Sequence, residues 1–326
     1  MKAIQIEKTG DVGVLQLKEI AIPSPSAGEV LVRLKASGIN FADIYTRRGL
    51  YARYQHTMPF TPGMEGSGIV ESVGDGVTEV KPSDRVAYAG STGSYAEYAV
   101  VKASQLIPLP DGISFEEGAA FPLQGLTAQY LIYEFYPIKP GDVVTVHAAA
   151  GGVGLLLVQW AKYVGAKVIG TVSTDEKAAL AREAGADLII NYTVNDFISQ
   201  TMNFTSGRGA DYIIDGVGLS TFAKDIEAVR VRGHICLFGS SSGQAEPIAP
   251  GMLMLKSITI HGGLLGNFTQ SREELLHRAT VVLNAIREGW LKLRIDKIFP
   301  LAQASEAHRM LESRKTTGKV ILKIDD

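Results

Sequence analysis

The sequence predicts an α/β protein in which a doubly wound parallel sheet accompanies a β-rich region. From Val143 onward, apolar strand-like runs alternate with helical segments, which is typical of a parallel sheet covered by helices on both faces. Before that point, short strand-like runs are separated by Gly- and Pro-rich turns such as Pro23–Pro25 and Gly74–Gly76, which indicates a compact, irregular β-domain.

The predicted parallel strands are short and rich in Val and Ile, as strands buried on both faces are. They are expected at Val143–Val146, Lys167–Val172, Leu188–Ile190, Tyr212–Ile214, Ile235–Phe238 and Ser257–Gly263. Helices are expected between them, at Leu155–Ala161, Asp175–Ala184, Asp196–Met202 and Thr221–Val229. Gly165 and Gly185 follow the first two helices, where glycine commonly ends a helix.

The β-rich region is predicted from runs of alternating character at both ends of the chain. Its first strands are expected at Ala3–Ile6, Val30–Ala36, Gly68–Val73, Arg85–Ala89 and Tyr95–Val101. After about residue 265 the strand–helix alternation stops. Helices at Arg272–Glu288 and Ser305–Ser313 and strands at Lys297–Pro300 and Lys319–Ile324 are expected there.

Composition is that of a soluble two-domain protein. The chain has 326 residues, 46% of them hydrophobic, and a formal net charge of −2, which gives no electrostatic footprint for nucleic acid or an anionic membrane. The N-terminal MKAIQIEKTGDVG has no apolar signal region, and no run reaches the ~18 apolar residues of a membrane span. The single cysteine, Cys236, excludes an intramolecular disulfide and lies in a predicted core strand. We expect a cytoplasmic protein.

The glycine-rich turn after Val146 favours a dinucleotide site. Its pattern is A-x-G-x-x-G, with Ala149 where the full fingerprint has glycine, followed by Gly151 and Gly154. Glycines between a strand and a helix allow backbone N–H groups to approach a phosphate, and the helix N-terminus adds partial positive charge. A βα turn without a ligand is the alternative for these residues alone. The position after the first parallel strand favours the dinucleotide.

The end of the second strand distinguishes the two dinucleotides. An NAD site places a carboxylate there for the ribose 2′-hydroxyl, but this strand ends in Thr171-Val172-Ser173. Ser173 can donate to a phosphate, and Lys177 adds positive charge one turn into the next helix. The pair fits the 2′-phosphate of NADP, although Lys177 could also be a solvated helix residue.

A second motif points to a different chemistry. Gly239–Gly243 matches the G-x-S-x-G nucleophile elbow of hydrolases and would make Ser241 a nucleophile. That motif needs a helix immediately after it, whereas Gln244–Gly251 contains Pro247 and Pro250 and is expected to be a loop. Hydrolysis is therefore disfavoured.

Several segments together resemble one enzyme family along nearly the whole chain. They are GEVLVRLKASGINFADIYTRRGLY (28–51), PGMEGSGIVESVG (62–74), GSYAEYAVV (93–101), HAAAGGVG (147–154), DGVG (215–218) and ESRKTTGKVIL (312–322). In this order they resemble the zeta-crystallin-type quinone oxidoreductases, a zinc-free branch of the medium-chain dehydrogenase/reductase superfamily. The resemblance implies a GroES-like catalytic domain at residues 1–122 and 266–326 and a Rossmann NADP-binding domain at 123–265, with the cofactor in the cleft between them. It also implies two-fold pairing at Ser257–Gly263, hence a homodimer or a dimer of dimers.

Zinc-dependent relatives carry metal ligands at positions that this chain fills differently. Asn40 stands where they have a cysteine, and Met64 stands where they have a histidine. Structural zinc needs four Cys or His ligands, and the chain has one cysteine and six histidines without metal-ligand spacing. We expect no metal site.

The resemblance also assigns the reacting groups. Asn40, Asp43, Tyr45 and Tyr51 are implied to lie near the nicotinamide and the acceptor. The implied cofactor-binding residues are Asn40, Ala150, Gly151, Gly152, Val153, Ser173, Lys177, Tyr192, Phe238, Gly239, Ser240 and Lys319. Asn40 could bond the carboxamide or the acceptor oxygen, and the tyrosines could stack on a flat ring. An ordinary loop with surface aromatics is the alternative for Tyr45 and Tyr51, and a charged turn residue is the alternative for Lys319.

The expected activity is therefore reduction of a small quinone by NADPH, with neither metal nor flavin. No residue stands out as a general acid, so solvent could protonate the product. Reduction of an activated C=C bond in an enal, enone or enoyl thioester is the alternative within the enzyme class. An RNA-binding or structural role is the alternative outside it, and the near-neutral charge argues against RNA.

Overall fold

The computed structural model describes residues 1–50 and 56–324, and it divides into two compact units. The β-rich unit comprises Met1–Leu123, Thr269–Thr280 and Leu293–Asp326, and the sheet unit comprises Gln124–Phe268 and Val281–Lys292. In the described part of the chain no helix is long and apolar enough to cross a membrane.

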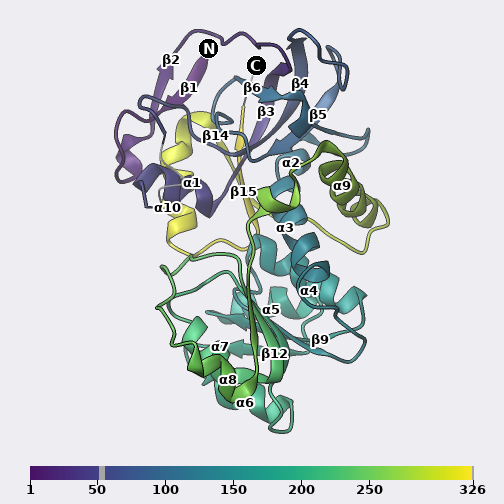
Figure 1. Cartoon of the computed structure of the whole chain (residues 1–326). Helices are drawn as coiled ribbons and strands as arrows, with labels where there is room; N and C mark the ends of the chain where they lie inside the picture. Colours follow the sequence, from purple (N-terminus) through teal and green to yellow (C-terminus); the bar gives the residue numbers. More distant parts are fainter. Residues whose placement is uncertain (51–55, 325–326) are drawn as a thin grey trace. The chain divides into compact units, whose positions relative to one another are not determined.

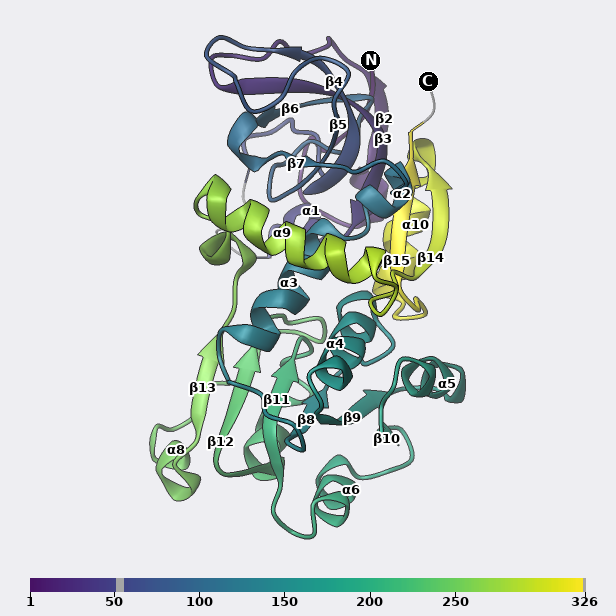
Figure 2. The same cartoon turned by 90° about the vertical axis from the view of Figure 1, so that its right-hand side faces the viewer.

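The sheet unit is built on a six-stranded parallel sheet (Figure 2). Its strands are β8 (Val143–Val146), β9 (Lys167–Val172), β10 (Leu188–Asn191), β11 (Ala210–Asp215), β12 (Val229–Leu237) and β13 (Thr259–Gly262). They lie in the order β10-β9-β8-β11-β12-β13. Numbered from β8, this is the 3-2-1-4-5-6 order of the Rossmann fold, so the predicted doubly wound sheet is confirmed.

Helices connect the parallel strands where the periodicity predicts them. They are α4 (Gly152–Tyr163), α5 (Asp175–Glu183), α6 (Phe197–Phe204) and α7 (Phe222–Ala228). Helix α8 (Gly251–Lys256), which precedes β13, was not predicted. Helix α3 (Pro122–Tyr133), which precedes β8, was not predicted. Most of its residues are buried all round, so it lacks the polar stripe by which an amphipathic helix is detected.

The β-rich unit contains a seven-stranded sheet and a small hairpin. The sheet order is β14-β15-β3-β4-β5-β7, with β6 also paired to β3, and β1 pairs with β2. The strands are β1 (Lys2–Gln5), β2 (Gln16–Glu19), β3 (Glu29–Ile39), β4 (Glu65–Val73), β5 (Arg85–Ala89), β6 (Tyr98–Lys102), β7 (Ile107–Pro108), β14 (Ile295–Pro300) and β15 (Lys319–Lys323). Because β15 pairs with β3, the end of the chain completes the sheet begun by its start, as the resemblance implies.

The remaining helices and 3₁₀ turns complete the description. They are α1 (Phe41–Arg48), α2 (Phe115–Gly118), α9 (Arg272–Arg287), α10 (Ala304–Glu312) and the 3₁₀ turns η1 (Val12–Val14), η3 (Ala103–Gln105), η4 (Leu265–Phe268) and η5 (Leu301–Gln303). In the β-rich unit, α10 packs against α1 (Figure 1).

Helix α1 begins and ends on clear local signals. At its start the Asp43 carboxylate accepts the Asn40 backbone N–H, and Gly49 ends it in the left-handed conformation with φ +65°. The segment is short, and it was expected only as a loop or ligand-binding stretch. Its position immediately after β3 places Asn40 and Asp43 at one end of a central strand.

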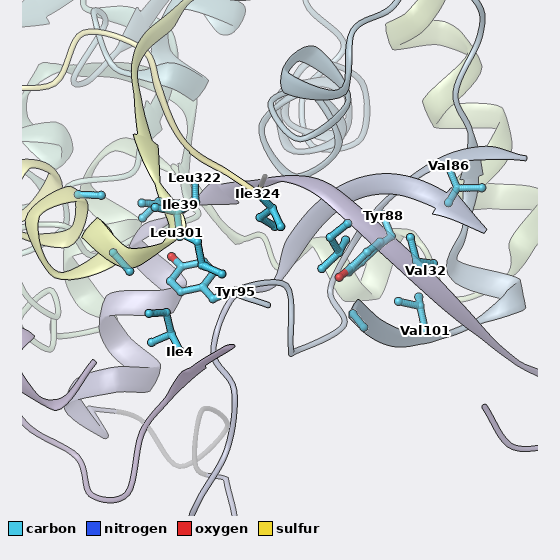
Figure 3. Packing of buried hydrophobic residues seen from close by; sticks show 14 of the residues in the cluster. Ile4, Val32, Ile39, Val86, Tyr88, Tyr95, Val101, Leu301, Leu322 and Ile324 are labelled. Carbon is cyan, nitrogen blue, oxygen red and sulfur yellow. The ribbon is translucent and has the colours of Figure 1, made fainter. Parts of the chain in front are cut away.

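The core of the β-rich unit is an apolar cluster that contains two buried tyrosines. Figure 3 shows Tyr88 and Tyr95 as members of the same cluster as Ile4, Val32 and Leu301. Cys236 is buried in β12 of the sheet unit, so its predicted place in a core strand is confirmed.

Candidate functional site

In the sheet unit, the glycine-rich turn has the geometry of a phosphate cradle. Helix α4 begins at Gly152, and its first backbone N–H groups have no partner within the helix. A Cβ added to Gly154 would lie 2.2 Å from the carbonyl oxygen of Ala148, so only glycine lets the helix approach the strand this closely. An added Cβ on Gly152 would overlap the Gln124 side chain. The turn therefore fits the pyrophosphate of a dinucleotide.

The alanine in the first fingerprint position is accommodated by the neighbouring strand. Ala149 is fully buried and donates its backbone N–H to the Thr171 carbonyl at 3.0 Å. A Cβ added to Gly170 on β9 would lie 2.9 Å from the Ala149 methyl group. The missing side chain at Gly170 thus leaves room for Ala149. Ala150 is also buried, so neither alanine side chain is exposed at the turn. Gly151, Gly152 and Val153 are half-buried.

The residues expected at the adenosine end lie together. Val172 and Asn191 are register partners at the ends of β9 and β10, so the residues that follow them, Ser173 and Tyr192, lie at the same edge of the sheet. Tyr192 donates its backbone N–H to the Val172 carbonyl at 3.1 Å, and its side chain is 51% exposed. Lys177 follows in the first turn of α5, which Thr174 caps. This edge offers a cation and a hydroxyl where an NAD site has a carboxylate.

The segment after β12 lies at the carboxyl edge too. Phe238 donates its backbone N–H to the Asp215 carbonyl at 3.0 Å, and its ring would be 2.6 Å from a Cβ added to Gly216. Gly239 and Ser240 follow. After Gly243 the chain has neither helix nor strand until α8 begins at Gly251. The expected loop is confirmed, and Ser241 lacks the immediate helix of a nucleophile elbow.

In the β-rich unit, Asn40 is the centre of a buried ionic cluster that also contains Glu65 and Lys319. The Asn40 Nδ2 group donates to Glu65 Oε2 at 3.0 Å, and the Lys319 Nζ group donates to Asn40 Oδ1 at 2.7 Å and to Glu65 Oε2 at 2.5 Å. The Leu123 backbone N–H donates to the other carboxylate oxygen at 2.7 Å. Glu65 and Lys319 are 0% and 1% exposed, so both charges are compensated inside the protein.

Glycine at position 38 makes this cluster possible. A Cβ added to Gly38 would lie 2.5 Å from Glu65 Oε2 and 2.6 Å from Lys319 Cε. A side chain on β3 at this point would therefore displace both charged groups. The sequence GIN, with Gly38 two residues before Asn40, keeps the space in which the cluster forms.

Asp43 lies beside this cluster and is also fully buried. Its Oδ2 atom accepts the Asn40 backbone N–H at 2.8 Å and the Tyr95 hydroxyl at 3.2 Å. Burial raises the pKa of Asp43 to about 7, against the lowering effects of the Asn40 N–H, Lys319 and Tyr95. The carboxyl group therefore changes charge in the neutral range.

The structure brings Asn40, Asp43 and Lys319 together, but it treats the two expected tyrosines differently. Tyr45 is only 9% exposed, and its ring lies 6.3 Å from that of Phe41, so most of it packs inside the unit. Tyr51 lies outside the described residues. The roles of both stay predictions.

Sequence reasoning missed Glu65, Tyr95 and His308. Glu65 stands in the PGMEG segment that supports the resemblance, and a lone acid at the start of an apolar strand could have marked it as a buried ion-pair partner. Tyr95 and His308 are far apart in sequence and carry no local motif. Only the pairing of the chain's two ends reveals them.

A second missed pair lies directly after β8. His147 Nε2 lies 2.7 Å from Asp225 Oδ1, and His147 Nδ1 lies 2.9 Å from the Thr171 hydroxyl. Burial raises the pKa of Asp225 to about 7. Burial alone would lower the pKa of His147, but the Asp225 carboxylate reverses this and raises it. The pair ties the residue before the glycine-rich turn to α7.

Side chains that could bind a metal are scattered across the described part of the chain. Among the described residues, no three His, Cys, Asp or Glu side chains lie close enough to hold a metal ion. The Asn40 amide forms hydrogen bonds with Glu65 and Lys319. Met64, where zinc-dependent relatives are expected to have a histidine, directly precedes Glu65.

Comparison with known proteins identifies the family. A family profile for the alcohol dehydrogenase GroES-like domain matches residues 26–111, and one for zinc-binding dehydrogenase matches residues 152–280. The quinone oxidoreductase of Pseudomonas aeruginosa is 40% identical over 323 residues, which cover 98% of this chain and 99% of the relative. The chain belongs to the quinone oxidoreductase family of medium-chain dehydrogenases/reductases.

Other members of this family and its neighbours agree in fold. The crystal structure of Escherichia coli quinone oxidoreductase complexed with NADPH has a TM-score of 0.95 and 39% identity, covering 99% of this chain and 100% of that one. The 2-haloacrylate reductase of a Burkholderia species is 35% identical over 98% of each chain. The profile named for zinc-binding dehydrogenases covers neither Asn40 nor Met64. That these two residues replace the zinc ligands of other relatives stays a prediction.

Proposed function

We propose that this protein is an NADPH-dependent reductase of small quinones that uses neither a metal nor a flavin. The observation that carries the proposal is the carboxyl edge of the parallel sheet, where a glycine cradle lies beside Ser173 and Lys177 instead of a carboxylate. The similarity to quinone oxidoreductases supports the choice of acceptor.

The proposed cofactor contacts are distributed along this edge. Backbone groups of Ala150, Gly151, Gly152 and Val153 would hold the pyrophosphate, and Ser173 and Lys177 would hold the 2′-phosphate. Further contacts are proposed for Tyr192 at the adenosine end and for Phe238, Gly239 and Ser240 after β12. When bound, NADPH supplies the hydride from its nicotinamide ring, and the protein contributes binding and orientation.

The hydrogen bonds of Asn40 limit what it can offer a ligand. Its amide hydrogens donate to Glu65 Oε2 and, at 3.3 Å, to the Gly38 carbonyl, while its backbone N–H donates to Asp43. The Oδ1 atom accepts from Lys319 and retains one lone pair. We infer that Asn40 acts toward the nicotinamide carboxamide as an acceptor, not as a donor to the quinone oxygen.

Lys319 is proposed to act mainly through Asn40. Two of its three ammonium hydrogens are directed to Asn40 and Glu65, and 1% of its surface is exposed. The ammonium group fixes the Asn40 amide so that Oδ1 cannot exchange places with Nδ2. Reduction of a quinone needs little more from the protein, because the anionic product is delocalised and can take its proton from solvent.

Reduction of an activated C=C bond is the second candidate. The observation that favours it is the 35% identity to a 2-haloacrylate reductase over nearly the whole chain. That chemistry also uses a hydride acceptor conjugated to an electron-withdrawing group. The two candidates differ in acceptor, not in cofactor site.

A homodimer in the cytoplasm is proposed as the working form. Strand β13 ends the order of the parallel sheet, and α8, which precedes it, exposes 79% of Met254 and 85% of Leu255. Apolar residues beside a sheet edge favour pairing with another chain. The single, buried Cys236 fits a reducing compartment.

The experiment is an acceptor panel monitored by NADPH oxidation. Purified protein, free of flavin absorbance and treated with a chelator, is given simple ortho- and para-quinones, enones, alkenals and, in reverse with NADP, alcohols. Preferential turnover of quinones supports the first proposal. Preference for an enone or alkenal selects the second, and turnover of alcohols alone would refute both.

A further inference from the structure

A line of buried polar side chains starts on α1, passes through α10 and returns to α1 inside the β-rich unit. Arg47 Nη1 lies 3.1 Å from His308 Nδ1, and His308 Nε2 lies 2.9 Å from the Tyr95 hydroxyl oxygen. The Tyr95 hydroxyl reaches Asp43 Oδ2, which also accepts the Asn40 backbone N–H. None of these five residues is more than 5% exposed. The line therefore ends on the residue that begins α1 and carries the site amide.

The chemistry of the groups gives this line a single direction. An arginine has only donors, so His308 Nδ1 must accept from Arg47. Burial and the Arg47 charge lower the pKa of His308 to about 3, so the imidazole is neutral and carries its proton on Nε2. His308 then donates to the Tyr95 oxygen, and the one hydroxyl hydrogen of Tyr95 goes to Asp43.

We propose that Tyr95 and His308 are positioning residues for the reduction: they orient the Asp43 carboxylate, which fixes Asn40 at the start of α1. This inference rests on the proposed function, since it names the support of the same site. Neither residue is assigned to touch cofactor or acceptor, and both act through Asp43.

The orientation of Asp43 depends on this line because, among the described groups, hydrogen-bond donors reach only one of its two carboxylate oxygens. Among the described groups, Asp43 Oδ1 is buried without a hydrogen-bond partner. Oδ2 has two donors, the Asn40 N–H and the Tyr95 hydroxyl. Without the hydroxyl, one donor would remain, and the carboxyl group would be free to rotate away from Asn40.

The same contacts control the charge on Asp43. Lys319 and the Tyr95 hydroxyl favour the carboxylate, Glu65 disfavours it, and Arg47 and His308 act through Tyr95. An ionised Asp43 accepts the Asn40 N–H more strongly than a neutral one. We therefore expect kcat to rise with pH through a midpoint near 7, the value to which burial raises the pKa of Asp43.

The test compares two buried tyrosines of one cluster. Tyr95→Phe removes the donor to Asp43, whereas Tyr88→Phe removes a buried hydroxyl that has no partner among the described residues. The readout is the pH profile of kcat with NADPH and a small quinone. In Tyr95→Phe the midpoint should move upward by about one to two pH units, because a hydrogen bond to a charged group is worth about 1.5–3 kcal/mol. In Tyr88→Phe it should stay in place.

Two histidine variants separate positioning from mere packing. The amide of His308→Gln can accept from Arg47 and donate to Tyr95, so its midpoint should stay near that of the unmodified protein. His308→Leu can do neither and should shift in the direction of Tyr95→Phe. Circular dichroism verifies that each variant is folded, and NMR titration of ¹³C-labelled aspartate, assigned with Asp43→Asn, reports the Asp43 pKa without turnover.

The outcomes are distinguishable. An unmodified protein without quinone turnover would refute the proposed function. Normal turnover with an unmoved profile in folded Tyr95→Phe, or an NMR shift without a matching shift in kcat, would overturn this inference alone. Equal shifts in Tyr95→Phe and Tyr88→Phe would also overturn it.

Discussion

Replacing Lys319 by methionine should lower the unfolding free energy of the β-rich unit by more than the loss of an exposed lysine side chain would. Methionine fills much of the same space but leaves the Glu65 carboxylate buried without its cation. Of the donors on described residues, the carboxylate would keep the Asn40 amide and the Leu123 N–H. Asn40 Oδ1 would lose its only protein donor described here.

The magnitude follows from the burial of both partners. Breaking a buried ion pair by removing one partner costs about 3–5 kcal/mol of unfolding free energy, because the remaining charge is uncompensated. Exposures of 0% for Glu65 and 1% for Lys319 place this pair in that regime. Adding Glu65→Gln to Lys319→Met removes the charge, and the glutamine amide can accept from Leu123 and donate to Asn40. The double variant should therefore recover about half of the loss.

The assay is chemical denaturation followed by circular dichroism, with hydrogen exchange on peptides from β3 and β15 as a local readout. Lys323→Met is the matched control, since Lys323 lies on the same strand but is exposed, and it should change the unfolding free energy by less than about 0.5 kcal/mol. Equal stabilities of Lys319→Met and Lys323→Met would refute the reasoning. A double variant less stable than Lys319→Met would also contradict it.

Further predictions concern the cofactor, the pH dependence of stability, the assembly and the metal. Lys177→Ala should weaken NADPH binding about ten- to a hundredfold, the worth of one charge-assisted hydrogen bond, and leave NADH nearly unchanged; equal affinities of the unmodified protein for both cofactors would argue against this. Because burial raises the pKa of Asp43 from 3.8 to about 7, the folded state holds its proton longer. The contribution of Asp43 to the unfolding free energy is therefore complete below about pH 4 and is lost as the pH rises to 7. Denaturation curves should show the unmodified protein losing up to about 4 kcal/mol relative to Asp43→Asn across that range. An equal pH dependence of the two proteins would contradict the raised pKa of Asp43. Leu255→Glu should convert the proposed dimer to monomers in light scattering, and a stable monomer before the change would refute the dimer. Elemental analysis should find no stoichiometric metal, and chelator should leave activity intact.

The doubly wound sheet was predictable because its signals are local. Most of the parallel strands contain a short apolar run, such as Val143–Val146 in β8 and Leu188–Ile190 in β10, and glycines such as Gly165 and Gly185 mark where helices end. The glycine-rich turn could be placed after the first strand for the same reason. Strand ends and turn chemistry are read from neighbouring residues, so no knowledge of the tertiary structure is needed.

The polar interior of the β-rich unit was predictable only in part. Asn40, Asp43 and Lys319 were expected from the resemblance, but their partners were not. Lys319 reaches Asn40 because β15 pairs with β3, although the two strands are far apart in sequence. His308 and Tyr95 are likewise far apart in sequence and meet only in the folded unit. Helices α1 and α3 were missed for a different reason: α1 is only two turns long, and α3 is buried all round.

The central claim is direct hydride transfer from NADPH to a quinone, and one measurement tests it most directly. Flavin-free, chelator-treated protein is mixed in a single turnover with a small para-quinone and NADPH that carries deuterium at the transferred position of the nicotinamide. The account predicts rapid cofactor oxidation that is slower with the deuterated cofactor than with the ordinary one. Oxidation that requires added metal or flavin, or the absence of any quinone-dependent oxidation, would contradict it.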